Sequence, residues 1–129
     1  MTTLPDFART PLRDGEPRLD AERMDVYQVA REFYALACTF VLAGEGELRD
    51  QLRRGALSVL LNLSEGVGRS APADKRRFFS MARGSATECA AILDAIGIRG
   101  LVPHIECRRG HARLIRVIAM LTRLQQRCE

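Results

Sequence analysis

Apolar residues recur every three or four positions in four long segments of the chain, and glycines separate these segments. This spacing places apolar side chains on one face of an α-helix. Ser70 and Pro72 add a start signal to the third segment, because proline is favoured in the first turn of a helix. No stretch shows the alternation that predicts a half-buried strand. The pattern therefore predicts four amphipathic helices, over residues 21–43, 47–66, 72–98 and 103–127.

Each predicted helix carries an apolar stripe that we expect to face a common core. In chain order, the four stripes contain Val26, Val29, Ala30, Phe33, Ala37, Phe40 and Val41; Leu48, Leu52, Val59 and Leu63; Phe78, Ala82, Ser85, Cys89, Ile92 and Ile96; and Leu114, Ile115, Ile118, Leu121 and Thr122. Short connections between such helices favour an antiparallel up-down-up-down four-helix bundle, so the expected fold class is all-α. Residues 1–20, which contain three prolines, are expected to form an irregular N-terminal arm, and residues 21–129 to form the bundle.

Composition narrows the possible functions. Lys75 is the only lysine among 20 basic residues, and a net charge of +4 is compatible with a polyanionic partner. Aromatic residues make up 5% and Trp is absent, which argues against a surface that stacks nucleobases. The four cysteines form no CxxC pair, so reduced thiols are expected. No apolar stretch fits a signal peptide or a membrane span, which predicts a cytoplasmic protein that does not contact the membrane.

The second predicted helix has apolar residues on two sides. Leu57, Leu60 and Leu61 fall opposite the stripe that includes Val59 and Leu63. A helix with two apolar faces is usually buried on both, so we expect these three leucines to form an interface between copies of the chain. Alternatively, they widen the core stripe or lie under the N-terminal arm.

Arginines form a stripe on the fourth predicted helix. At helical pitch, its members all lie within about 40° of Arg109 and opposite the apolar stripe. They are Arg109, Arg113, Arg116, Arg123 and Arg127. A solvent-exposed face usually mixes charges of both signs, whereas this one is purely cationic. The stripe is therefore a candidate nucleic-acid-binding surface, with an ordinary solvated face as the alternative.

Polar residues gather on the second and third predicted helices, within or beside the apolar stripes. They are Ser58, Asn62, Glu65 and Arg69, followed by Ser85 and Glu88. Partly buried polar groups need partners, so a hydrogen-bonded network between the two helices is expected. Two carboxylates could also act as acid and base, but no histidine lies nearby in the sequence and no phosphate-binding glycine loop is present. We therefore expect no enzyme activity and no cofactor.

Three residues of types that bind metals lie near the start of the fourth predicted helix. His104, Cys107 and His111 lie within about 60° of one another at helical pitch. That face is also the apolar stripe, where a cysteine is more often a small buried hydrophobe. No metal site is predicted.

Two stretches of the sequence carry a recognisable pattern. Residues 51–70 read QLRRGALSVLLNLSEGVGRS, and residues 75–89 read KRRFFSMARGSATEC. The pattern resembles the bacterial family of four-helix bundles that includes proteins encoded in intervening sequences of 23S ribosomal RNA genes. This family is related to the accessory variability determinant of diversity-generating retroelements. The matching positions are Leu52, Arg53, Arg54, Ser58, Asn62, Glu65, Gly66, Arg69, Phe78, Gly84, Ser85 and Glu88.

The resemblance covers residues 24–127, and Gly55 departs from it because an alanine is common at that position. It implies a four-helix-bundle protomer that assembles into a homopentamer with a basic surface and has no established catalysis. It also implies a partner, either structured RNA or a reverse transcriptase with its RNA. We therefore expect a non-enzymatic homo-oligomer that binds RNA or another polyanion through arginine-rich helix faces. The alternative is a protein–protein interaction scaffold, such as a reverse-transcriptase accessory subunit.

Overall fold

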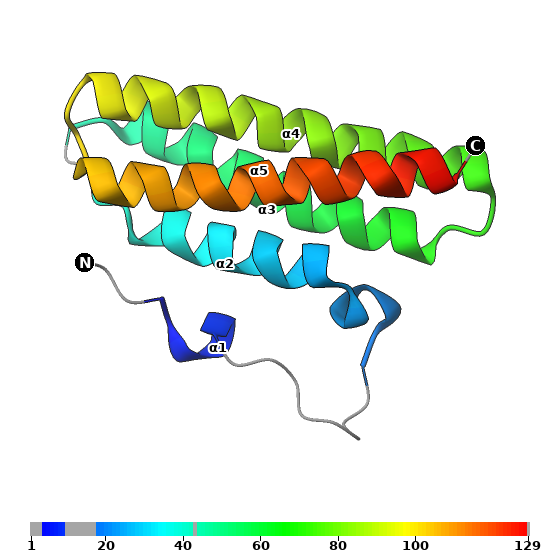
Figure 1. The fold of residues 1–129 in the computed structure, drawn as a ribbon. Coiled ribbons are helices and arrows are strands. Elements are labelled where there is room, and N and C mark those ends of the chain that lie inside the picture. Colours follow the sequence, from blue (N-terminus) through cyan, green and yellow to red (C-terminus); the bar gives the residue numbers. More distant parts are fainter. Residues whose placement is uncertain (1–3, 10–17, 43, 129) are drawn as a thin grey trace.

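A computed structural model describes residues 4–9, 18–42 and 44–128 of the chain (Figure 1). Its four long helices are α2 (Asp25–Thr39), α3 (Gly46–Gly68), α4 (Pro72–Ile98) and α5 (His104–Arg127). A short helix, α1 (Asp6–Arg9), and a 3₁₀ turn, η1 (Asp20–Arg23), precede them. The long helices run alternately up and down, and α5 packs against both α4 and α2 (Figure 1). The predicted all-α four-helix bundle is confirmed.

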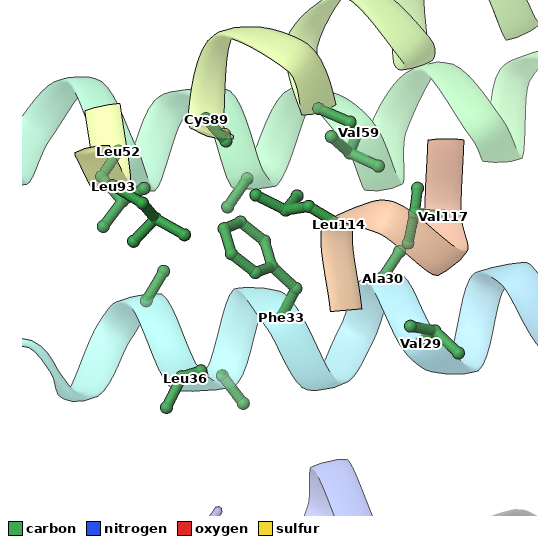
Figure 2. Close-up of a cluster of buried hydrophobic side chains, with 14 of the residues drawn as sticks. Val29, Ala30, Phe33, Leu36, Leu52, Val59, Cys89, Leu93, Leu114 and Val117 are labelled. Atoms are coloured by element: carbon green, nitrogen blue, oxygen red, sulfur yellow. The ribbon is translucent and has the colours of Figure 1, made fainter. Parts of the chain in front are cut away.

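The core lies along the axis of the bundle. Phe33 projects from α2 toward the side chains of α3, α4 and α5 (Figure 2). Among the described residues, the largest fully buried side chains come from all four long helices, and they are Phe33, Leu36, Leu52, Val59, Leu63, Cys89, Ile96, Leu114, Val117 and Leu121. Burying such side chains stabilises the fold by about 1.5–3 kcal/mol each.

The end of α2 differs from the prediction that it continues to residue 43. The helix ends at Thr39, whose Oγ1 donates a hydrogen bond to the carbonyl of Leu36 at 2.6 Å. The extended backbone that follows turns successive side chains to opposite sides. Phe40 and Leu42 are therefore buried, whereas Val41 is 82% exposed. The assignment of Val41 to the core stripe was wrong.

The buried face of α5 also differs in part from the predicted apolar stripe. Ile115, which we assigned to the core, is 56% exposed, whereas Val117 is fully buried with Leu114 and Leu121. Positions 114, 117 and 121 follow the helical repeat, and position 115 lies about 100° from 114, outside the contact with α2 and α4.

The N-terminal segment is not entirely irregular. Helix α1 packs on the outer side of α2, where Leu4 and Ala8 are buried. Gln28 Nε2 donates a hydrogen bond to the carbonyl of Ala8 at 2.7 Å, and Arg31 Nη2 donates one to the carbonyl of Phe7 at 2.7 Å. Two prolines of the predicted arm, Pro11 and Pro17, lie outside the described residues.

None of the described helices combines the length and the apolar character that crossing a membrane requires.

Candidate nucleic-acid interface

Helix α5 is strongly cationic. It contains six arginines and one acidic residue, Glu106. Its buried side faces α2 and α4, so most of these charges lie toward the surface or at its edge.

The first two arginines of the predicted stripe are paired with carboxylates. Arg109 Nη1 lies 3.2 Å from Glu106 Oε1, and the Glu106 side chain is almost completely buried. Arg113 Nε lies 3.4 Å from Glu32 Oε1 on α2, and Arg113 Nη1 donates a hydrogen bond to the carbonyl of Arg109. The expectation that the whole stripe faces solvent was therefore wrong for Arg109 and Arg113. Both are engaged in structural ion pairs.

The other three members of the stripe are exposed. Arg116, Arg123 and Arg127 form no ion pair with any acidic residue in the part of the chain that the structure describes. Arg123 and Arg127 line a hollow of about 260 Å³, together with apolar residues of α2 and α5 and with Asp25. These three guanidinium groups are available to contact phosphates.

Part of the predicted polar network between α3 and α4 is present, and it consists of Ser58, Asn62 and Ser85. Ser58 Oγ lies 2.8 Å from Ser85 Oγ, and Asn62 Nδ2 donates to Ser58 Oγ at 2.9 Å and to the Ser58 carbonyl at 3.0 Å. Because Asn62 donates to the Ser58 hydroxyl, Ser58 can donate its own proton to Ser85. The network fixes the register of two helices.

The two carboxylates of this polar group do not come together as an acid–base pair. Glu65 Oε1 lies 2.6 Å from Arg69 Nη2 in an exposed ion pair one helical turn away. Glu88 is exposed on α4. Neither carboxylate takes part in the hydrogen bonds that join Ser58, Asn62 and Ser85.

The corner between α3 and α4 contains contacts that the sequence analysis missed. Lys75 Nζ donates hydrogen bonds to the carbonyls of Gly66 at 3.3 Å and Val67 at 2.8 Å, which satisfies the C-terminal end of α3. The guanidinium groups of Arg69 and Arg77 lie 4.8 Å and 4.5 Å from the centre of the Phe78 ring. The KRRFF segment was a signal for these contacts, since it places cations next to an aromatic residue at a helix start.

Glycines of the family pattern have different surroundings. Gly66 is buried, and a Cβ added there would lie 2.8 Å from Phe79 Cε1. Gly66 therefore permits close packing of α3 on α4. Gly84 lies in the middle of α4 and is exposed, with no atom within 4 Å of an added Cβ.

The leucines of the predicted interface divide into two groups. Leu60 is half-buried, packs against the core and lines a cavity beside the N-terminal segment. Leu57 is 39% exposed and Leu61 is 60% exposed. For Leu60, the alternative that these leucines widen the core stripe is therefore correct. Leu57 and Leu61 remain accessible on the outer face of α3.

The cysteines and histidines form no metal centre in the described part of the chain, where no group of three potential ligands is suitably placed. All four cysteines are free thiols. Burial raises the pKa of Cys89 to about 12 and also raises the pKa of Cys107. His104 and His111 lie exposed at the surface of α5.

The fold and these contacts define a class of small helical-bundle proteins with a cationic helix and a hydroxyl-linked α3–α4 pair. The family model of the 23S rRNA-intervening sequence protein matches residues 22–123. The chain belongs to this family. No curated protein sequence matches the chain.

Proposed function

We propose that the protein is a non-enzymatic homo-oligomeric bundle that binds the phosphate backbone of RNA. The observation that carries the proposal is the exposed arginine group of α5, Arg116, Arg123 and Arg127, which forms no ion pair with an acidic residue among the described residues. Three exposed arginines on one helix fit a polyanion better than they fit a mixed-charge protein surface. Contacts to phosphate position a nucleic acid without reading its sequence.

Assembly would strengthen this binding. Leu57 and Leu61 give α3 an accessible apolar surface, which supports an interface between copies of the chain. Several copies of one modest arginine group, held in a ring, would bind a long RNA far more tightly than one copy does. The family resemblance supports a homopentamer, a bacterial origin and a cytoplasmic location, and we include these in the proposal.

Measurement of RNA retention against salt tests the proposal. Three phosphate contacts per chain give a slope of log affinity against log salt of about −2 to −3. The variant Arg116→Gln/Arg123→Gln/Arg127→Gln should lose most of this slope. The matched control, Arg49→Gln/Arg54→Gln/Arg83→Gln, removes the same amount of charge from α3 and α4. Its salt slope should equal that of the wild type. Equal losses in both variants would reject α5 as the binding surface.

The second candidate is a protein-interaction scaffold, such as an accessory subunit of a reverse transcriptase. Exposed isoleucines favour it, because Ile98 and Ile115 border a hollow of about 550 Å³ between α4 and α5. Absence of RNA retention by the wild-type protein even at low salt would reject the RNA proposal and favour the scaffold.

A further inference from the structure

A hollow of about 500 Å³ lies between the N-terminal segment, α2 and α3. It is separate from the arginine group of α5 and from the α3–α4 network. We propose that this cavity binds a small aromatic acid. Its lining residues are Pro5, Phe7 and Ala8 from the N-terminal segment, Tyr27, Arg31, Tyr34, Ala35, Cys38 and Thr39 from α2, and Leu60 from α3.

The walls of the cavity suit an aromatic molecule. Phe7 stands on one side, and Tyr27 and Tyr34 stand on α2. These are three of the seven aromatic residues of the chain, and both of its tyrosines are among them. Flat aromatic ligands gain from offset or edge-to-face contacts with such rings. The volume lies within the range of about 300–1,000 Å³ that is usual for small-molecule sites.

The charge at the cavity suits an acid. Among the lining residues that the structure describes, Arg31 is the single charged one and none is acidic. Its guanidinium group is held in place, since Nη1 donates to Gln28 Oε1 at 3.0 Å and the group lies 4.9 Å from the centre of the Phe7 ring. A fixed guanidinium group with further donors favours a carboxylate or sulfonate.

A second guanidinium group lies behind the cavity wall. Arg53 Nη2 donates to the carbonyl of Cys38 at 3.3 Å, and Arg53 Nε is buried with no hydrogen-bond partner in the described structure. Tyr34 adds no negative charge, because its pKa is raised, chiefly by the hydrogen bond with the Cys38 side chain. Arg31 at the cavity and Arg53 next to Cys38 therefore supply two guanidinium groups to this region.

The N-terminal segment forms one side of the site. Helix α1 is a single helical turn that is joined to α2 through Gln28 and Arg31. A ligand between Phe7 and α2 would contact both segments at once. Binding should therefore protect the backbone amides of residues 6–9 from hydrogen exchange.

Titration with anilinonaphthalene sulfonate, an aromatic acid that fluoresces in apolar sites, tests the proposal on the full-length protein. Phenylnaphthylamine, which has the same rings without the sulfonate, serves as the neutral probe. We expect saturable binding of the acid at one site per chain, at least about tenfold tighter than binding of the neutral dye. The tyrosine fluorescence should change in parallel, because Trp is absent and both tyrosines line the cavity.

Two variants locate the site. Ala35→Leu fills the cavity and should abolish binding of both dyes. Arg31→Gln removes the charge and the hydrogen bond to the Phe7 carbonyl, so it should weaken binding of the acid about tenfold more than binding of the neutral dye. Arg31→Gln changes no core residue, so it tests the proposal even if Ala35→Leu does not fold. The control Ile105→Ser removes an exposed apolar residue of α5, away from the cavity, and should bind as the wild type does. Non-saturable binding, equal affinity for the two dyes, or unchanged binding in Arg31→Gln would overturn the proposal.

Discussion

Gly55 of α3 packs directly against the thiol of Cys89 on α4, because a Cβ added at Gly55 would lie 2.7 Å from Cys89 Sγ. Cys89 is fully buried, and its sulfur occupies the space that an alanine methyl group at position 55 would need. This contact gives a physical reason for the departure of Gly55 from the alanine that is common in the family pattern. The two positions form one packing unit.

Gly55→Ala should therefore destabilise the fold by about 1–2 kcal/mol, because overpacking outweighs the better helix propensity of alanine. In a Cys89→Ala background, the sulfur is gone, and the same substitution should become neutral or stabilising by up to about 1 kcal/mol. Urea unfolding of the four proteins in this cycle measures both effects. Additive changes in unfolding free energy would contradict the shared packing unit.

Two other glycines should respond in opposite directions. Gly66→Ala forces a methyl group to within 2.8 Å of Phe79 Cε1 and should lower the unfolding free energy by about 1–3 kcal/mol. Gly84→Ala meets no atom within 4 Å and should raise it by about 0.5–1 kcal/mol. Thermal unfolding of both variants is the measurement. If Gly84→Ala lowered the unfolding free energy as much as Gly66→Ala does, this would contradict an open surface at Gly84.

Stability should fall at alkaline pH because of Cys89. Burial raises its pKa from 9.0 to about 12, so the unfolded chain loses this thiol proton at a lower pH than the folded chain does. The unfolded state then binds fewer protons, and the unfolding free energy falls by about 1.4 kcal/mol per pH unit between pH 9 and 12. Below pH 9 the contribution is fully present.

Unfolding in urea between neutral pH and about pH 10.5 checks this expectation. Cys89→Ala is the comparison, since it lacks this proton but keeps Cys107, whose pKa is also raised. The unfolding free energy of Cys89→Ala should fall less steeply with rising pH than that of the wild type. Equal slopes would contradict the buried, protonated thiol.

The ion pair between Arg113 and Glu32 should act on stability and not on RNA binding. Its side chains are only 20% and 24% exposed, and the pair joins α5 to α2. A double-mutant cycle with Arg113→Gln and Glu32→Gln should give a coupling energy of about 0.5–1 kcal/mol. RNA retention by Arg113→Gln should stay close to that of the wild type. A large loss of RNA retention in Arg113→Gln would show that Arg113 contributes to RNA binding.

The helix boundaries were predictable where local chemistry determines them. The third predicted helix, 72–98, has the same bounds as α4, since Pro72 favours a helix start and the glycines near residue 98 favour its end. The end of α2 was not predictable in this way. Phe40, Val41 and Leu42 continue an apolar run, and only the packing of the extended segment decides that Val41 faces solvent.

The candidate interface was predictable in part. Periodicity places the arginines opposite the core, which is correct for Arg116, Arg123 and Arg127. It does not reveal that Arg109 turns back to Glu106, although these residues lie three positions apart. The pairing of Arg113 with Glu32 depends on how α2 and α5 pack together, and no local pattern in one helix contains that information.

Lys75 closes the end of α3 with two hydrogen bonds, and it is the only lysine of the chain. Every side-chain amine reaction on this protein, whether acetylation or coupling to an active ester, is consequently a reaction at that one corner. Acylation of Lys75 removes its charge and most of its hydrogen-bond donors. This one modification would therefore weaken the contact between the end of α3 and the start of α4.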